Sequence, residues 1–338
     1  MSMKPGAQER AQVSKQALSR DAVPADGSGV ALDASKVASK RKQQWKEFGR
    51  ALLYMAPAIL FLIAFTYVPF LRSIWLSFFV TNPQGQTVRF NDIKYYSRIF
   101  NFDGSGRTEY LKSILTTAYF SLMVVPLGII FALGLALLAT LRVKAISFFR
   151  TIFTSSIAIS VASASVIWAL IYSPTTKATQ WIIELLHLSS GSLLQNSSTA
   201  LLAVAFTTVW TALGFNFIVT LSGLQAIPED IYESALIDGA TSWKSFRFIT
   251  LPLLTPTLLF LILINTIQSF QAFTQFNVLI GNEGPDNATN VFVYSIFTAF
   301  WKDNRYGFAS AMSVVLFLIL LVLTFIQFRL LDRRVHYQ

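Results

Sequence analysis

Residues 223–252 read GLQAIPEDIYESALIDGATSWKSFRFITLP, a polar stretch between two long apolar ones. Pro228 suits the first turn of a helix, because the N–H group that proline lacks would have no partner there. The acids Glu229 and Asp230 follow at positions that the positive end of a helix dipole favours. These residues predict that a short helix begins at about residue 228.

The same stretch also predicts where this helix ends and where the next one begins. Gly239 can adopt the left-handed conformation that ends many helices. Ser242 can cap a following helix, and Pro252 then opens the next apolar segment. Two short helices joined by a turn indicate a docking surface for another protein, although a connector that binds nothing could show the same pattern.

On both sides of this segment the chain has apolar stretches long enough to cross a membrane. A transmembrane helix needs about 20 apolar residues, and six stretches reach that length. They are 51–71, the stretch between Lys112 and Arg142, 152–172, 200–221, 251–276, and the stretch between Arg305 and Arg329. We therefore predict an all-α integral membrane protein with six transmembrane helices.

The composition agrees with a membrane protein and excludes several kinds of site. Hydrophobic residues make up 54% of the chain and charged residues 13%, against roughly 25% charged in soluble domains. The absence of cysteine excludes disulfides, thiolate metal sites and cysteine nucleophiles. Because there are only two histidines, we expect no metal site and no cofactor.

Basic residues predict the orientation of the chain, since they favour the cytosolic side of a membrane protein. Residues 142–150 contain three basic residues and no acid, and Arg333 and Arg334 lie near the C-terminus. This pattern predicts that both termini lie in the cytosol. The loop 78–110, on the other side, opposes the bias with Arg89, Lys94, Arg98 and Arg107.

The N-terminal region differs from the rest of the chain. Residues 1–44 are basic and poor in apolar side chains, so we predict a disordered tail before a transmembrane domain over 45–338. Residues 36–50 either form a basic helix on the membrane surface or simply flank the first span. The net charge of +10 lies mainly in this tail and in the 142–150 loop, so it does not indicate a nucleic acid partner.

The predicted spans have no charged residue near their middle. Proton-coupled carriers usually need such residues as relays, whereas sodium coupling through carbonyl groups remains open. No phosphate-binding loop of the Gly-x-x-x-x-Gly-Lys-Ser/Thr type occurs, so ATP-driven transport would need another polypeptide. Ser155 and Ser156 have no catalytic base near them in the sequence, and we expect the chain not to be an enzyme.

The 223–252 segment resembles the motif of ABC-importer permeases. That motif is Glu-Ala-Ala, three residues, Gly, nine residues and Ile-x-Leu-Pro. Here it reads Glu233-Ser234-Ala235, three residues, Gly239, nine residues and Ile249-Thr250-Leu251-Pro252. Ser234 is the only departure, one small residue in place of another.

The resemblance covers roughly residues 45–338 and extends to the end of the chain. Residues 327–338 look like the ends of sugar and glycerol-3-phosphate permeases. The outer loop and the entrance of the sixth span look like those of carbohydrate-type permeases, at Gly284-Pro285, Tyr294, Phe300 and residues 306–311.

The resemblance implies the fold of a type I ABC importer permease. It implies transport of a sugar or oligosaccharide, with glycerol-3-phosphate as the alternative. The implied partners are a second permease subunit in a heterodimer, two cytosolic ATPase subunits and an extracytoplasmic binding protein. The implied location is the cytoplasmic membrane of a bacterium or archaeon. An ion-coupled carrier, a channel or a membrane scaffold would leave the motif unexplained.

The resemblance also implies a role for the 223–252 segment as the coupling loop that sits in a cleft of the ATPase. Glu233 would accept charge-assisted hydrogen bonds from the ATPase, and Gly239 would supply the turn. The residues implied in coupling are Glu233, Ser234, Ala235, Gly239, Ile249, Leu251 and Pro252.

The fifth predicted span carries a row of amides that could line the substrate pathway. On a helical wheel they fall within an arc of about 120°, and amides suit sugar hydroxyls, whereas a phosphate would prefer a cation. The alternative is that they only join helices through hydrogen bonds. The predicted pathway residues are Asn265, Gln268, Gln271 and Gln275, with Asn216 of the fourth span, and Phe270, Phe273 and Phe276 are candidate stacking faces.

Overall fold

The computed structural model describes residues 28–102, 108–140, 146–185 and 192–332. The tail 1–27 and the basic markers Arg107, Arg142, Lys144, Arg333 and Arg334 lie outside these ranges. The chain divides into two units, residues 1–69 and 70–338, which we describe separately.

The described part of the first unit, residues 28–69, is helical. It contains α2 (Ser28–Leu62) and the π-helical turn η1 (Ile63–Tyr67), and α3 (Val68–Leu76) begins at its end and belongs mostly to the second unit. The helix starts at Ser28 and so includes residues 28–44 of the predicted tail. Residues 43–76 are long and apolar enough to cross a membrane, and none of the most apolar window is buried.

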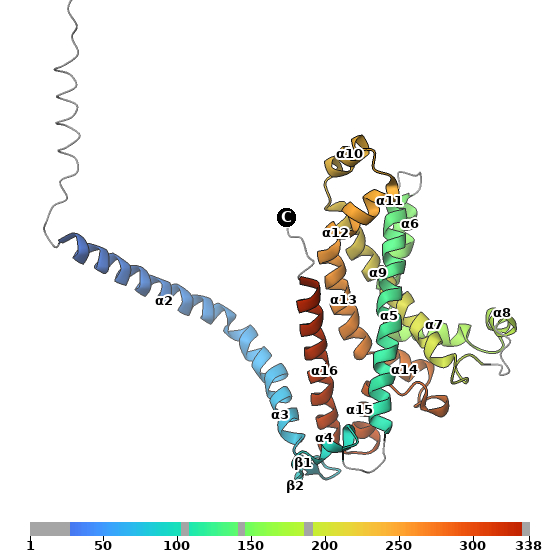
Figure 1. Ribbon diagram of the computed structural model, residues 1–338. Coiled ribbons are helices and arrows are strands. Elements are labelled where there is room, and N and C mark those ends of the chain that lie inside the picture. Colours follow the sequence, from blue (N-terminus) through green and yellow to red (C-terminus); the bar gives the residue numbers. More distant parts are fainter. Residues whose placement is uncertain (1–27, 103–107, 141–145, 186–191, 333–338) are drawn as a thin grey trace, which may run out of the picture. The chain divides into compact units, whose positions relative to one another are not determined.

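The second unit is built around four helices, α5 (Glu109–Ala139), α9 (Ala200–Gln225), α13 (Thr255–Phe270) and α16 (Tyr306–Asp332). α5 lies along α9 and also contacts α13, which lies beside α16 (Figure 1). α5 and α9 approach closely because small residues line their interface, as in other membrane helices. Gly128 lies against Asn216, and Ala136 is buried in a cluster with Phe217.

The third predicted span is not a straight helix. α6 (Ile146–Ser155) and η2 (Ser156–Ala158) are followed by α7 (Val161–Ile171), which is bent from them by 103°. Ile159 is extended at the break, and the Ser160 hydroxyl accepts a hydrogen bond from the Ser163 N–H at 3.1 Å. The single helix predicted over 152–172 is therefore wrong.

The fifth predicted span is also broken. α11 (Ser242–Ser245), η3 (Phe246–Thr250) and α12 (Leu251–Leu253) are bent by 63° from α13. Because Pro256 has no N–H, it cannot donate to the carbonyl of Pro252, and the helical ladder is interrupted there. The helix begins at Thr255 and ends at Phe270, so the predicted bounds 251–276 are wrong at both ends.

The described residues contain four helices that are long and apolar enough to span a membrane, or up to six if each bent pair counts as one span. The prediction of a mostly helical membrane protein is thus confirmed. The count of six spans is reached when each bent pair is taken as one span, so two of the six are broken rather than straight.

The two ends of the second unit carry different elements (Figure 1). At one end, which we call the α10 end, α10 (Glu229–Ile237) lies between α9 and α11 along the chain. At the other, the hairpin end, β1 (Phe79–Thr81) and β2 (Thr87–Phe90) pair antiparallel. This hairpin is absent from the all-α prediction. The unit also contains six shorter elements. They are α4 (Lys94–Ile99), α8 (Lys177–Leu185), α14 (Thr274–Leu279), η4 (Pro285–Asn287), α15 (Phe292–Phe297) and η5 (Thr298–Lys302).

Candidate functional site

The turn after α10 has the geometry that the sequence predicts. Gly239 has a φ of +76°, in the left-handed region that glycine tolerates best. Its N–H donates to the carbonyl of Leu236 at 3.1 Å, and the N–H of Ala240 donates to the carbonyl of Ala235 at 2.9 Å. These two bonds form a Schellman motif, which satisfies carbonyls that the helix end leaves open.

The next helix is capped one residue earlier than predicted. Thr241, not Ser242, is the N-cap, and its hydroxyl accepts from the N–H of Lys244 at 3.4 Å. The two parts of the segment are also joined directly, because the hydroxyls of Tyr232 and Thr250 lie 3.0 Å apart. The segment therefore has a defined shape within this chain.

The 223–252 segment exposes apolar side chains next to its acids. Glu233 and Ser234 are exposed, whereas Ala235 is buried, and Ile249, Leu251 and Pro252 are half-buried. Large exposed apolar surfaces often mark interaction sites. The most exposed apolar residues of the segment are Leu236, Ile237, Trp243 and Phe248, at 68%, 87%, 70% and 74%.

A polar cavity of about 490 Å³ lies between α9, α13, α14 and the break between η2 and α7. Four of the predicted amides line it, namely Asn265, Gln268, Gln271 and Gln275. The wheel that grouped them assumed one helix, which is wrong because Gln271 ends α13 and Gln275 belongs to α14. The change of direction still brings Gln275 to the same cavity.

Several cavity residues were missed by the sequence analysis. Serines and threonines are common in membrane helices and usually bond to their own backbone, so they gave no signal. Of the three candidate stacking rings, Phe273 lines the cavity, whereas Phe270 and Phe276 are buried in the core. The missed lining residues with polar or aromatic side chains are Ser156, Thr208, Thr211, Phe215, Ser269 and Thr274.

Asn216 is not among the residues that line the cavity. Its side chain is fully buried and faces Asn265 of α13. The Asn216 Nδ2 donates to the Asn265 Oδ1 at 3.2 Å, and the Asn265 Nδ2 donates back at 2.9 Å. This pair has the geometry of a joint between α9 and α13, which was the alternative to a pathway role.

We expect that Asn265→Leu destabilises the protein, because it leaves the buried amide of Asn216 without its partner. The free energy of unfolding should fall by about 1–2 kcal/mol, measured as a lower thermal midpoint in detergent. Asn277→Leu is the matched control, since Asn277 is exposed. The double variant Asn216→Leu/Asn265→Leu should recover part of the loss, and an unchanged midpoint for Asn265→Leu would contradict the joint.

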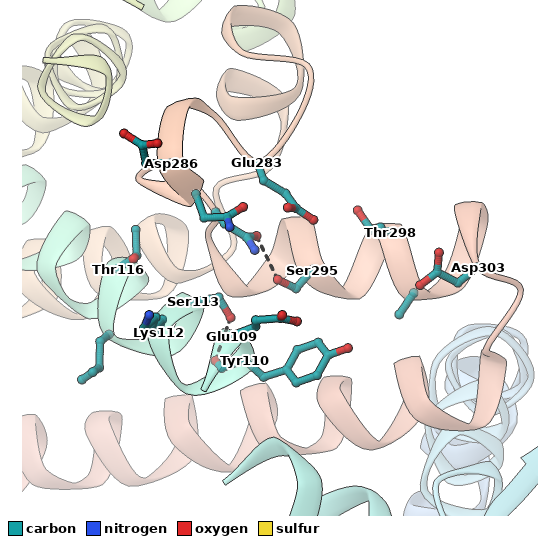
Figure 2. A pocket seen from close by; sticks show the side chains of 14 residues that line it. Glu109, Tyr110, Lys112, Ser113, Thr116, Glu283, Asp286, Ser295, Thr298 and Asp303 are labelled. Atoms are coloured by element: carbon teal, nitrogen blue, oxygen red, sulfur yellow. Dashed lines mark hydrogen bonds between the residues drawn. The ribbon is translucent and has the colours of Figure 1, made fainter. Parts of the chain in front are cut away.

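A second cavity, of about 600 Å³, lies at the hairpin end and is acidic (Figure 2). Glu109 begins α5, Glu283 and Asp286 come from the loop after α14, and Asp303 follows η5. Lys112 is the single basic residue among the described lining residues. The sequence analysis missed this cavity because its acids come from three segments that are far apart in the chain.

Comparison with known proteins then assigns the chain to a family. Residues 107–337 match the family model described as "Binding-protein-dependent transport system inner membrane component". The chain belongs to this family. It is a multi-pass membrane protein and a permease subunit of a binding-protein-dependent ABC importer, as the motif at 233–252 predicts.

Relatives of this permease are known in bacteria. It is 30% identical over 287 residues to the sn-glycerol-3-phosphate transport system permease protein UgpA of Agrobacterium fabrum, covering 84% of this chain and 95% of the relative. The UgpA of Escherichia coli O157:H7 is 30% identical over 289 residues, covering 85% of this chain and 95% of that one.

Two solved structures have the same fold as this permease. One is a chain of a bacterial ABC transporter involved in the import of the acidic polysaccharide alginate, with a TM-score of 0.70 and 22% identity over 86% of this chain and 99% of that chain. The other is that transporter with an alginate pentasaccharide-bound periplasmic protein, with a TM-score of 0.70 and 21% identity over 86% and 97%. The predicted type I ABC permease fold is confirmed.

Proposed function

We propose that this permease carries a neutral sugar or oligosaccharide through the polar cavity. The supporting observation is the lining, which holds four amides, several hydroxyls and the rings of Phe215 and Phe273, and no charged side chain among the described residues. Amides can donate to and accept from sugar hydroxyls. Aromatic faces supply an apolar surface with specific geometry for a sugar ring to lie against.

The importer would contain more subunits than this one. We assign it a second permease subunit in a heterodimer, two cytosolic ATPase subunits and an extracytoplasmic binding protein that delivers the sugar. The α10 end and both termini would then face the cytosol of a bacterium. The exposed apolar side chains and Glu233 of the 223–252 segment support this orientation, because they would offer the ATPase a surface to bind.

The 223–252 segment would act as the coupling loop. Its local bonds, the Schellman motif at Gly239 and the contact between Tyr232 and Thr250, make it stiff. A stiff element at the end of the spans can transmit closure of the ATPase pair as a rigid-body movement. The break between α12 and α13 at Leu254 is where such a movement would reach α13, whose C-terminal part lines the cavity.

Glycerol-3-phosphate is the second candidate, and the names of the UgpA relatives favour it. A phosphate in the polar cavity would need a cation, which the second permease subunit would have to supply.

The deciding experiment uses the complex that co-purifies with this chain, together with its binding protein, in liposomes. We expect that neutral di- and trisaccharides stimulate ATP hydrolysis through the binding protein and that sn-glycerol-3-phosphate does not. Stimulation by glycerol-3-phosphate alone would reject the neutral-sugar proposal and support the second candidate. The absence of any co-purifying ATPase would instead count against the coupling role of the 223–252 segment.

A further inference from the structure

Two arginines at the hairpin end lie against the same aromatic ring. The guanidinium carbon of Arg305 is 4.3 Å from the centroid of Phe308, and that of Arg98 is 5.7 Å from it. Tyr95 and Tyr110 pack edge-on against this ring at 5.3 and 5.0 Å. Phe308 is fully buried, so both cations lie beside a ring that its own packing holds in place.

The two arginines beside the Phe308 ring are not directly paired with an acid in the part of the chain that the structure describes. Within the described residues, no ion pair joins Arg98 or Arg305 to a carboxylate. Burial raises the pKa of the nearby Tyr95 phenol, while the charges of Arg305, Arg98 and Arg89 act to lower it. A third arginine, Arg89, is therefore close enough to add to the positive potential at Tyr95. Like charges this near to each other repel, and a bound anion would offset that cost.

The position of these arginines beside the start of α16 indicates what the anion is. Arg305 directly precedes α16, whose residues 306–329 form a candidate span, and Phe308 lies in its first turn. The two guanidinium groups therefore lie where the span leaves the hydrocarbon, at the depth of lipid headgroups.

Exposed aromatic side chains surround the start of α16 and support this depth. Trp301 is 68% exposed and packs on Phe300, which contacts Tyr306. Across the helix start, exposed Phe90 packs on Phe79, and the backbone of Phe79 contacts Gly307. Tryptophan and tyrosine residues gather at the membrane–water interface in this way.

We propose that Arg98 and Arg305 bind the phosphate of an anionic phospholipid at the hairpin end of the sixth span. Two planar guanidinium groups suit the oxygens of a phosphate, which they can bind in a bidentate manner. A lipid with a net negative charge is favoured over a zwitterionic one, because neither guanidinium group forms an ion pair with a carboxylate of the described residues. The site explains why basic residues lie in a loop where the orientation bias disfavours them, and it does not depend on the identity of the transported substrate.

The first test uses the full chain in its purified complex, without any substitution. Native mass spectrometry should show retained anionic phospholipid, and added phosphatidylglycerol should raise the thermal midpoint more than phosphatidylcholine does. An equal effect of the two lipids would overturn the proposal. An equal effect of inorganic phosphate or glycerol phosphate would also overturn it, because the site would then bind free phosphate and not a lipid.

The second test locates the lipid. Arg98→Gln/Arg305→Gln should lower phosphatidylglycerol retention by about tenfold or more, and the double lysine variant should keep part of it. Lys94→Gln is the matched control, since it removes one exposed charge from the same helix and leaves the Phe308 ring untouched. Unchanged retention in the glutamine variant would reject the site. Loss of binding-protein affinity with normal lipid retention would reject it in favour of a protein-docking surface.

Discussion

Uptake is expected to be lost, by more than about tenfold, when Gly239 is replaced by valine. The residue has a φ of +76°, which costs an L-residue about 1–2 kcal/mol and is least tolerable for a β-branched one. Valine would leave the left-handed region, so the Schellman bonds to Leu236 and Ala235 would break and α10 would point elsewhere. The measurement is substrate uptake alongside the amount of protein in the membrane fraction.

Insertion of this variant should be normal for a specific reason. A Cβ atom at Gly239 would meet nothing within 4 Å, so valine disturbs the turn without disturbing the packing of the spans. Gly239→Asn is the control, because asparagine tolerates the left-handed region, and it should retain most of the uptake. Normal uptake by Gly239→Val would mean that the coupling role of the 223–252 segment is wrong.

A fall in uptake of about tenfold is expected for Gln268→Leu. Gln268 is exposed within the polar cavity, and none of the hydrogen bonds within the described residues engages its amide. That amide is therefore free to bond to a substrate, and such a bond is worth about 1–1.5 kcal/mol, close to tenfold. Uptake should be measured in liposomes, and association of the ATPase should be unchanged.

Asn277→Leu is the matched control for this prediction as well. Asn277 is an exposed amide on α14 that does not line the cavity. Substrate uptake by the Asn277→Leu variant should therefore be normal. Unchanged uptake by Gln268→Leu would favour the view that the amides only join helices. A lower thermal midpoint of Gln268→Leu, comparable to that expected for Asn265→Leu, would point the same way.

The breaks in the two bent spans differ in how visible they are from the sequence. Pro256 lacks the N–H group that would donate to the carbonyl of Pro252, so one helical hydrogen bond cannot form. This break could have been recognised from the sequence. The break at Ile159 contains no proline. The turn just before it, η2, lies against Gly214 of α9, where an added Cβ would be 2.9 Å from the Ile157 nitrogen, so a residue in a distant helix makes room for this turn.

The four amides lie together for a different reason from the one that the helical wheel gave. Asn265, Gln268, Gln271 and Gln275 do line one cavity, but Gln275 reaches it because the helix ends at Phe270. Asn216 could not be separated from them by sequence, because a buried amide that joins helices and one that lines a cavity occupy similar positions on a helix. Only its contact with Asn265 distinguishes the two.

The sequence by itself determined the features that depend on neighbouring residues. The length of an apolar stretch sets whether it can cross a membrane, and Gly239 sets the turn of the 223–252 segment through its own backbone freedom. The tertiary structure alone decided where spans bend, which amides meet and which charges converge. The acidic cavity and the pair of arginines on Phe308 are assembled from segments far apart in the chain. Such contacts depend on how helices pack against one another, and no local pattern records that packing.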